Sequence, residues 1–136
     1  MAGGLPFRAS VSGRRPPGDP RHRLGRWGEC IAACWLRCCG YRVIARNWKT
    51  PAGEVDIVAR KGNTLVVCEV KSRRGAYPLR VNRRQQERLR RAAHWLHGRY
   101  QERDGIRIDI VEVRWPRHRW GWPRVKHHRD ILDDDR

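Results

Sequence analysis

The sequence predicts a single α/β domain in which a central mixed β-sheet is flanked by helices, in the order helix, three strands, helix, strand. Two segments place apolar residues at helical spacing, and the segments between and after them alternate apolar and polar residues as strands do. A chain of 136 residues is long enough to bury its own apolar core. We therefore expect one folded domain over residues 23–136.

Residues 1–22 are rich in Gly, Pro and Arg and lack periodicity, which predicts a disordered basic arm. The first helix is expected from about Leu24 to a stop at Gly40. Its proposed buried face follows steps of three and four residues: Leu24, Trp27, Ile31, Trp35 and Cys38.

Cysteines recur every fourth residue in this helix, at positions 30, 34 and 38, with Cys39 adjacent. They would form one stripe on the helix. The spacing contains neither Cys-x-x-Cys nor a fourth spaced ligand, so it argues against a metal cluster. Because a buried cysteine behaves as a small apolar residue, we expect the stripe to pack in the core.

Strands are expected at residues 41–47, 53–60 and 64–71, the last two being joined by a turn at residues 61–63. A second helix should run over residues 82–100, capped at its start by Asn82. Residues 106–114 alternate as a fourth strand, and residues 124–130 suggest a last edge strand. The second helix should bury Leu89, Ala92, Ala93 and Leu96.

The charge is strongly positive, with 31 Lys and Arg against 14 Asp and Glu, a formal net charge of +17. Such an excess favours a polyanionic partner, either nucleic acid or an anionic membrane surface. No apolar run approaches the ~20 residues of a membrane span, and the N-terminal stretch lacks the apolar core of a secretory signal. We expect a cytoplasmic protein with reduced cysteines that binds nucleic acid and no membrane.

The hairpin carries the residues that point to chemistry. If its turn centres between Gly62 and Asn63, Asp56 lies directly opposite Glu69, at ~5 Å between Cβ atoms, where like charges repel. A divalent cation such as Mg²⁺ would explain the pair, since it takes one or two carboxylates together with substrate phosphate oxygens. Lys71 would stand beside that metal.

The segment GRWGECIAACWLRCCGYRVIARNWKTPAGEVDIVARKGNTLVVCEVKSRRG resembles the core of the YraN family, which has the restriction-endonuclease-like fold. It is also similar in motif order to archaeal Holliday junction resolvases. The shared pattern is a helix acid, an Asp in a strand that starts with Gly, and then Glu-x-Lys. The resemblance implies that Asp56 and Glu69 bind Mg²⁺ or Mn²⁺, that Lys71 is catalytic, and that Glu29 is an accessory acid and metal ligand.

Residues 71–91 hold nine Lys or Arg and the single acid Glu87. Since this segment begins at Lys71, we expect it to line a phosphate channel. An ordinary solvated helix face, which usually mixes both signs, is the alternative. The nucleic-acid contacts expected here are Arg73, Arg74, Arg83, Arg84 and Arg88.

Residues 115–123 alternate Trp with Arg and resemble an insertion relative to the family. Their tryptophans suit two roles equally: stacking on unpaired bases or clamping the loop on the sheet. His127 and His128 point to opposite faces of a strand, and we interpret them as surface residues.

These features predict a Mg²⁺- or Mn²⁺-dependent endonuclease of the PD-(D/E)xK type that hydrolyses phosphodiester bonds, with DNA favoured over RNA. The resolvase similarity makes branched or junction DNA the first candidate substrate, and cutting two strands would suit a symmetric homodimer. The alternative is a non-enzymatic nucleic-acid-binding protein that retains an inactive or structural carboxylate site. An adaptor that docks on structured RNA is a third hypothesis.

Overall fold

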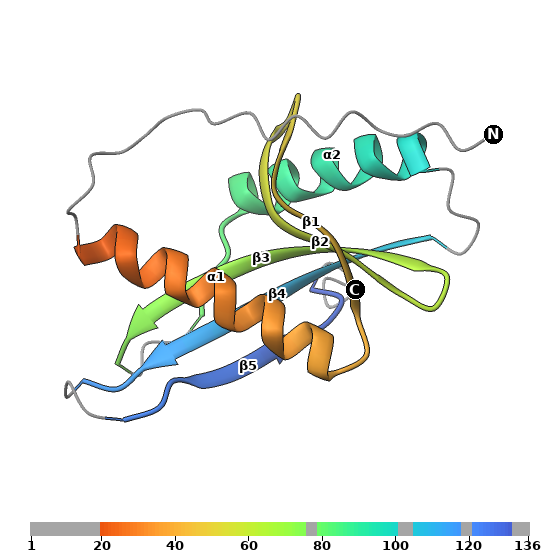
Figure 1. Ribbon diagram of the computed structural model, residues 1–136. Helices are drawn as coiled ribbons and strands as arrows, with labels where there is room; N and C mark the ends of the chain where they lie inside the picture. The colour runs from red at the N-terminus through yellow and green to blue at the C-terminus, as the bar shows by residue number, and fades with distance from the viewer. Residues whose placement is uncertain (1–19, 76–78, 101–104, 118–120, 132–136) are drawn as a thin grey trace.

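The computed structural model describes residues 20–75, 79–100, 105–117 and 121–131. Its order is helix, three strands, helix and two strands, as Figure 1 shows, and it confirms the predicted α/β class. The fifth strand is the edge strand that the sequence suggested. The elements are α1 (Pro20–Cys38), β1 (Arg42–Thr50), β2 (Gly53–Lys61), β3 (Thr64–Arg74), α2 (Arg83–Tyr100), β4 (Ile106–Trp115) and β5 (Arg124–His128).

The five strands form one mixed sheet in sequence order, from β1 at one edge to β5 at the other. β3 and β4 are parallel, and every other neighbouring pair is antiparallel. The parallel pair requires a crossover, which α2 supplies. β3 therefore lies at the centre of the sheet, between the hairpin partner β2 and the crossover partner β4.

Each helix covers a different apolar core. The core beneath α1 contains Leu36 and Ile57, whereas the core beneath α2 contains Leu65 and Leu96. In Figure 1 the hairpin of β1 and β2 curls out of the sheet beside α2. No helix in the described ranges is long and apolar enough to span a membrane.

Helix α1 differs from its prediction in two ways. It begins at Pro20, inside the segment assigned to the basic arm; residues 1–19 of that arm lie outside the described residues. Its predicted buried face was also wrong, since Trp27 is 63% exposed and Trp35 40% exposed. The residues that contact the sheet side are mostly small: Gly28, Ala32, Ala33 and Leu36.

The small residues allow a close approach between α1 and β3. A Cβ on Gly28 would lie 2.7 Å from the Cβ of Ser72, which is closer than two carbons can pack. The expectation of buried cysteines in α1 was also wrong, because the small residues and not the cysteines form the face that packs on the sheet. Cys30, Cys34 and Cys38 do form one stripe, but it is exposed.

Helix α2 confirms its predicted start and buried face. The Gln85 N–H donates to Asn82 Oδ1 at 2.9 Å, so Asn82 caps the helix. All four residues expected on its buried side are at most 2% exposed: Leu89, Ala92, Ala93 and Leu96.

Candidate carboxylate site

The hairpin has the register that the sequence predicted. Lys61 pairs with Thr64 around the turn, Gly62 has φ +58°, and Ile57 pairs with Cys68. Asp56 and Glu69 are the next residues beyond this last pair, and the charge of Glu69 acts on Asp56. The Val70 N–H donates to Asp56 Oδ2 at 2.8 Å, which ties the Asp56 carboxylate to β3.

Glu69 is buried and only half satisfied. Lys71 Nζ lies 3.3 Å from Glu69 Oε1, and Arg88 Nη2 lies 3.0 Å from the same oxygen. The other oxygen, Oε2, is buried without a hydrogen-bond partner within the described residues. A buried carboxylate oxygen without a partner is costly in free energy, so it marks a position where a cation or a donor would bind favourably.

Asp56 has a strongly perturbed carboxyl group. Its pKa is raised to about 7, mainly by burial and in addition by the negative charges of Glu29, Glu69 and Glu54. The hydrogen bond from Val70 opposes these effects. Three acidic neighbours around one half-buried carboxyl group disfavour its ionised form in the absence of a nearby cation.

The site suits a divalent cation held by two carboxylates, and does not suit one whose ligands all come from the protein. In the ranges that the structure describes, no three His, Cys, Asp or Glu side chains are grouped closely enough to hold a metal ion. Glu29 on α1 acts on Asp56 through its charge. Two carboxylates with open positions suit Mg²⁺, which keeps waters and takes phosphate oxygens as its other ligands.

Arg88 occupies a place that the sequence did not reveal. Besides its ion pair with Glu69, its Nη1 donates to the Glu54 carbonyl oxygen at 3.4 Å. Gly53 leaves room for it, because a Cβ there would lie 3.1 Å from Arg88 Cδ. The available signal was its neighbour Leu89, expected on the buried side of α2. Arg88 therefore belongs to the carboxylate site in this structure.

The other arginines expected to contact nucleic acid are not part of the ion pairs described for Glu69. Arg83 and Arg84 are exposed in the first turn of α2. Arg74 is exposed at the end of β3 and donates to the Pro116 carbonyl oxygen at 3.4 Å, while Arg73 is partly buried.

The prediction that both histidines of β5 are surface residues was wrong for His127, whose side chain is 6% exposed, whereas that of His128 is 26% exposed. They do point to opposite faces, but each meets a buried carboxylate of β4. His127 Nε2 lies 2.7 Å from Asp109 Oδ2, and His128 Nε2 lies 3.0 Å from Glu112 Oε2. Both acids are fully buried, so these pairs join the edge strand to the sheet.

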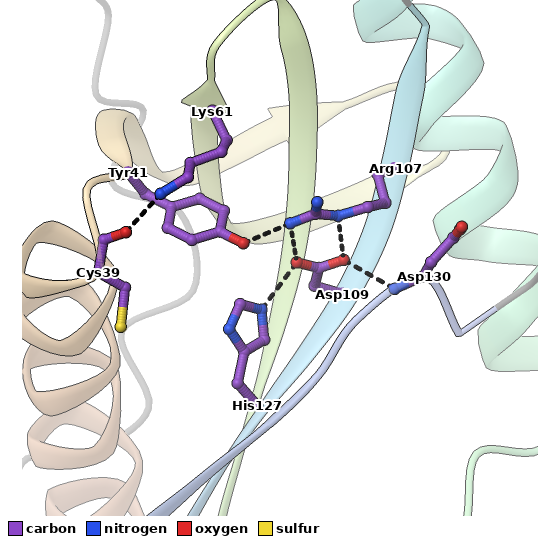
Figure 2. Close-up of polar contacts among 7 residues, drawn as sticks. All are labelled: Cys39, Tyr41, Lys61, Arg107, Asp109, His127 and Asp130. Atoms are coloured by element: carbon purple, nitrogen blue, oxygen red, sulfur yellow. Dashed lines mark hydrogen bonds and ion pairs between the residues drawn. The ribbon is translucent and has the colours of Figure 1, made fainter.

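Asp109 is the centre of the network in Figure 2. Arg107 donates to both of its oxygens, at 2.9 and 2.8 Å, and the Asp130 N–H donates at 2.9 Å. Burial alone would raise the pKa of Asp109, but the hydrogen bonds from His127, Arg107 and Asp130 outweigh burial and lower it. The Arg107 guanidinium also donates to the hydroxyl of Tyr41. Both Asp109 oxygens accept hydrogen bonds, although His127 Nδ1 is buried without a hydrogen-bond partner among the described residues, and we interpret this network as structural.

The two described tryptophans of residues 115–123 differ in their environment. Trp115 acts as a clamp, because its indole N–H donates to Ser72 Oγ at 2.7 Å and its ring packs against the core beneath α1. Trp122 is 92% exposed. Trp120 lies outside the described residues.

The fold and site define a class: a mixed-sheet α/β protein with a carboxylate pair and a lysine on two adjacent strands. The chain belongs to the uncharacterised protein family UPF0102, whose family model matches residues 28–113. This is the YraN family that the sequence resembled. The match spans Glu29, Asp56, Glu69 and Lys71, all the residues predicted to form the carboxylate site.

Similar proteins cover most of the chain. A UPF0102 protein of Parvibaculum lavamentivorans is 46% identical over 118 residues, which are 82% of this chain and 89% of the relative. One of Streptomyces griseus is 47% identical over 120 residues, 83% of this chain and 98% of the relative. One of Syntrophotalea carbinolica is 42% identical over 120 residues, 85% and 95% respectively. These names state the family and no activity.

Proposed function

We propose that this protein is a metal-dependent nuclease of the PD-(D/E)xK type, which hydrolyses phosphodiester bonds with Mg²⁺ or Mn²⁺ held by Asp56 and Glu69. The observation that carries the proposal is the buried Oε2 of Glu69, which has no hydrogen-bond partner in the described part of the chain and lies on the strand next to that of Asp56, whose pKa is raised to about 7. If the two carboxyl groups served only to stabilise the fold, we would expect ion pairs and hydrogen bonds to satisfy all of their oxygens. The open oxygen of Glu69 and the raised pKa of Asp56 are instead what we expect of a site that binds a cation.

Each side chain has a distinct part in this proposal. A bound divalent cation supplies Lewis-acid polarisation of a phosphoryl oxygen and lowers the pKa of water. Lys71, whose Nζ lies 3.3 Å from Glu69 Oε1, places a positive charge where negative charge develops on phosphorus. Glu29 is the accessory acid, since its charge already acts on Asp56 from α1.

Nucleic acid is the substrate that the charge favours. The net charge of +17 attracts a polyanion, and exposed arginines at the end of β3 and the start of α2 offer phosphate contacts. DNA with branches or junctions is the first candidate, from the motif order shared with resolvases. A symmetric dimer would bring two sites to two strands, and the free cysteines suit the reducing cytoplasm.

The rival hypothesis is a protein that binds nucleic acid without cutting it. The two cations on Glu69 Oε1 favour it, because Lys71 and Arg88 partly neutralise that carboxylate without a metal. In this case the carboxylate pair would be a relic or a structural feature. The two hypotheses differ in their response to metal ions.

Metal titration tests the site directly. We expect Mg²⁺ and Mn²⁺ to bind weakly and to raise the melting temperature of the wild type, measured by calorimetry and thermal shift. The double variant Asp56→Asn, Glu69→Gln should lose this response and remain folded. Glu87→Gln, which removes an exposed acid of α2, is the matched control and should respond as the wild type does. An unchanged response in the double variant would move the metal elsewhere.

Cleavage is then assayed with either metal on labelled single-stranded, duplex, flapped and four-way-junction DNA. The proposal predicts metal-dependent products from at least one of these substrates. Binding to the same panel without any product would favour the non-enzymatic hypothesis.

A further inference from the structure

Exposed aromatic side chains lie on α1 and just before β5. The large apolar residues that are exposed in the described parts of the chain are all tryptophans: Trp27 at 63%, Trp35 at 40% and Trp122 at 92%. An indole ring has an apolar body and a polar N–H, so an exposed tryptophan can serve as a binding residue. Trp35 lies two turns further along α1 than Trp27 and serves below as a reference.

A chain of contacts brings Trp27 and Trp122 to the same end of β3. Gly28, the neighbour of Trp27, packs against Ser72, the residue that follows Lys71. Ser72 Oγ accepts the hydrogen bond from Trp115, which is followed by Pro116.

Gly121, the neighbour of Trp122, completes this chain. A Cβ on Gly121 would lie 3.2 Å from Pro116 Cγ. In Figure 1 the carboxyl ends of β3 and β4 lie at the same end of the molecule as the start of α1. The two exposed rings therefore belong to segments that meet beside Ser72.

Positive charge surrounds these rings. Arg26 precedes Trp27 on α1, Arg74 ends β3, and Arg117 and Arg124 lie on either side of Trp122 in the sequence, and all four are exposed. A surface that binds another protein usually has few charged residues at its core. Aromatic rings among arginines are instead typical of surfaces that bind single strands, where the rings stack on bases and the arginines contact phosphates.

We infer that Trp27 and Trp122 stack on unpaired bases, so that a bound nucleic acid carries single-stranded nucleotides on the α1 side of the sheet, at the end of β3 that also carries Lys71. That these nucleotides belong to the substrate cut at Lys71 rests on the proposed function; the stacking itself does not. Trp115 is the positioning residue, since its hydrogen bond to Ser72 and its packing against the core fix the neighbouring Pro116, which lies against Gly121 beside Trp122.

Binding without metal tests the inference independently of cleavage. Labelled oligothymidine and a duplex of the same length are titrated in EDTA against Trp27→Ala, Trp122→Ala and the control Trp35→Ala. Stacking of one base on one ring predicts roughly 5- to 150-fold weaker binding of the single strand for each of the first two variants. Binding of the duplex should change little, and Trp35→Ala should bind both as the wild type does. Trp27→Phe should restore most of the affinity.

Three outcomes would overturn the inference: equal losses for single strand and duplex, a loss of the same size in Trp35→Ala, or a change of oligomeric state in Trp27→Ala by analytical ultracentrifugation. The last would make this face of α1 a protein interface. The inference and the proposed function fail separately. Selective loss of single-strand binding in a protein that never cuts would refute only the nuclease, and unchanged single-strand binding by the tryptophan variants of a protein that cuts would refute only the stacking.

Discussion

Asp56 shows how burial and like charge act together on a single residue. Its pKa of about 7 in the folded protein lies above the ordinary value of 3.8. Between pH 3.8 and about pH 7 the folded state keeps a proton on Asp56 that the unfolded state has lost. The contribution of Asp56 to the free energy of unfolding is therefore most favourable at low pH and falls as the pH rises. Above about pH 7 the full cost of an ionised, half-buried carboxylate is present.

Asp56→Asn should therefore flatten part of the pH dependence of stability. We expect the metal-free wild type to lose melting temperature relative to Asp56→Asn between pH 4 and pH 8, because only the wild type has a carboxylate to ionise. The asparagine oxygen can still accept the hydrogen bond from Val70. Adding Mg²⁺ at pH 8 should reduce the difference in melting temperature between the wild type and Asp56→Asn. Parallel curves for the two proteins would show that the environment of Asp56 is not the one described here.

The residues of the site could be predicted where local geometry fixes them. The period of two along a strand and the two-residue turn at Gly62 were sufficient to set Asp56 opposite Glu69 and to place Lys71 beside it. Arg88 could not be assigned to Glu69 from the sequence, because that contact depends on how α2 lies across the sheet. His127 was misjudged for the same reason, since its buried partner is on another strand.

The close approach of helix α1 to the sheet depends on Gly28, which has no side chain. Gly28→Ala should destabilise the fold by about 1–3 kcal/mol, because the added Cβ overlaps Ser72 and forces the helix outward. Gly25→Ala is the matched control on the same helix, where a Cβ meets nothing within 4 Å. It should stabilise by about 0.5–1 kcal/mol through helix propensity. Urea unfolding of both variants gives the comparison, and equal effects would contradict the close contact.

Element boundaries could be predicted well, whereas the buried face of α1 could not. Spacing by three and four identified the helix, but the large apolar residues at that spacing, Trp27 and Trp35, lie on its exposed side. The contact face consists mainly of Gly and Ala because the helix sits close to β3. Hydrophobicity alone cannot distinguish a face that packs closely from a face that binds a partner. The exposed stripe of cysteines illustrates the same difficulty.

For the whole molecule, charge should govern how nucleic acid binds. We expect the logarithm of affinity to fall linearly with the logarithm of salt concentration. Replacing both exposed arginines in the first turn of α2, Arg83→Gln with Arg84→Gln, should reduce the slope by about 2, if each contacts one phosphate. Arg37→Gln with Arg42→Gln removes the same charge near the end of α1 and the start of β1. An equal change of slope in both pairs would indicate diffuse attraction and no channel.

The central claim is that Lys71 is catalytic, and single-turnover cleavage of one substrate by wild type and Lys71→Ala tests it most directly. Lys71 is one of 31 basic residues, and Arg88 still pairs with Glu69 in its absence, so binding and folding should be nearly unchanged. Removing one preorganised charge typically lowers the rate by on the order of 10²–10³. Lys71→Arg should also fail, because the larger, planar guanidinium cannot place its charge at the position of the compact Lys71 ammonium.

Lys126→Ala, which removes an exposed lysine of β5, is the control for the loss of one positive charge. Equilibrium binding to the same substrate is measured for every variant. Lys71→Ala should bind as the wild type does and cut at least about 10²-fold more slowly, while Lys126→Ala should cut normally. Cleavage at the wild-type rate by Lys71→Ala would contradict a catalytic role for Lys71.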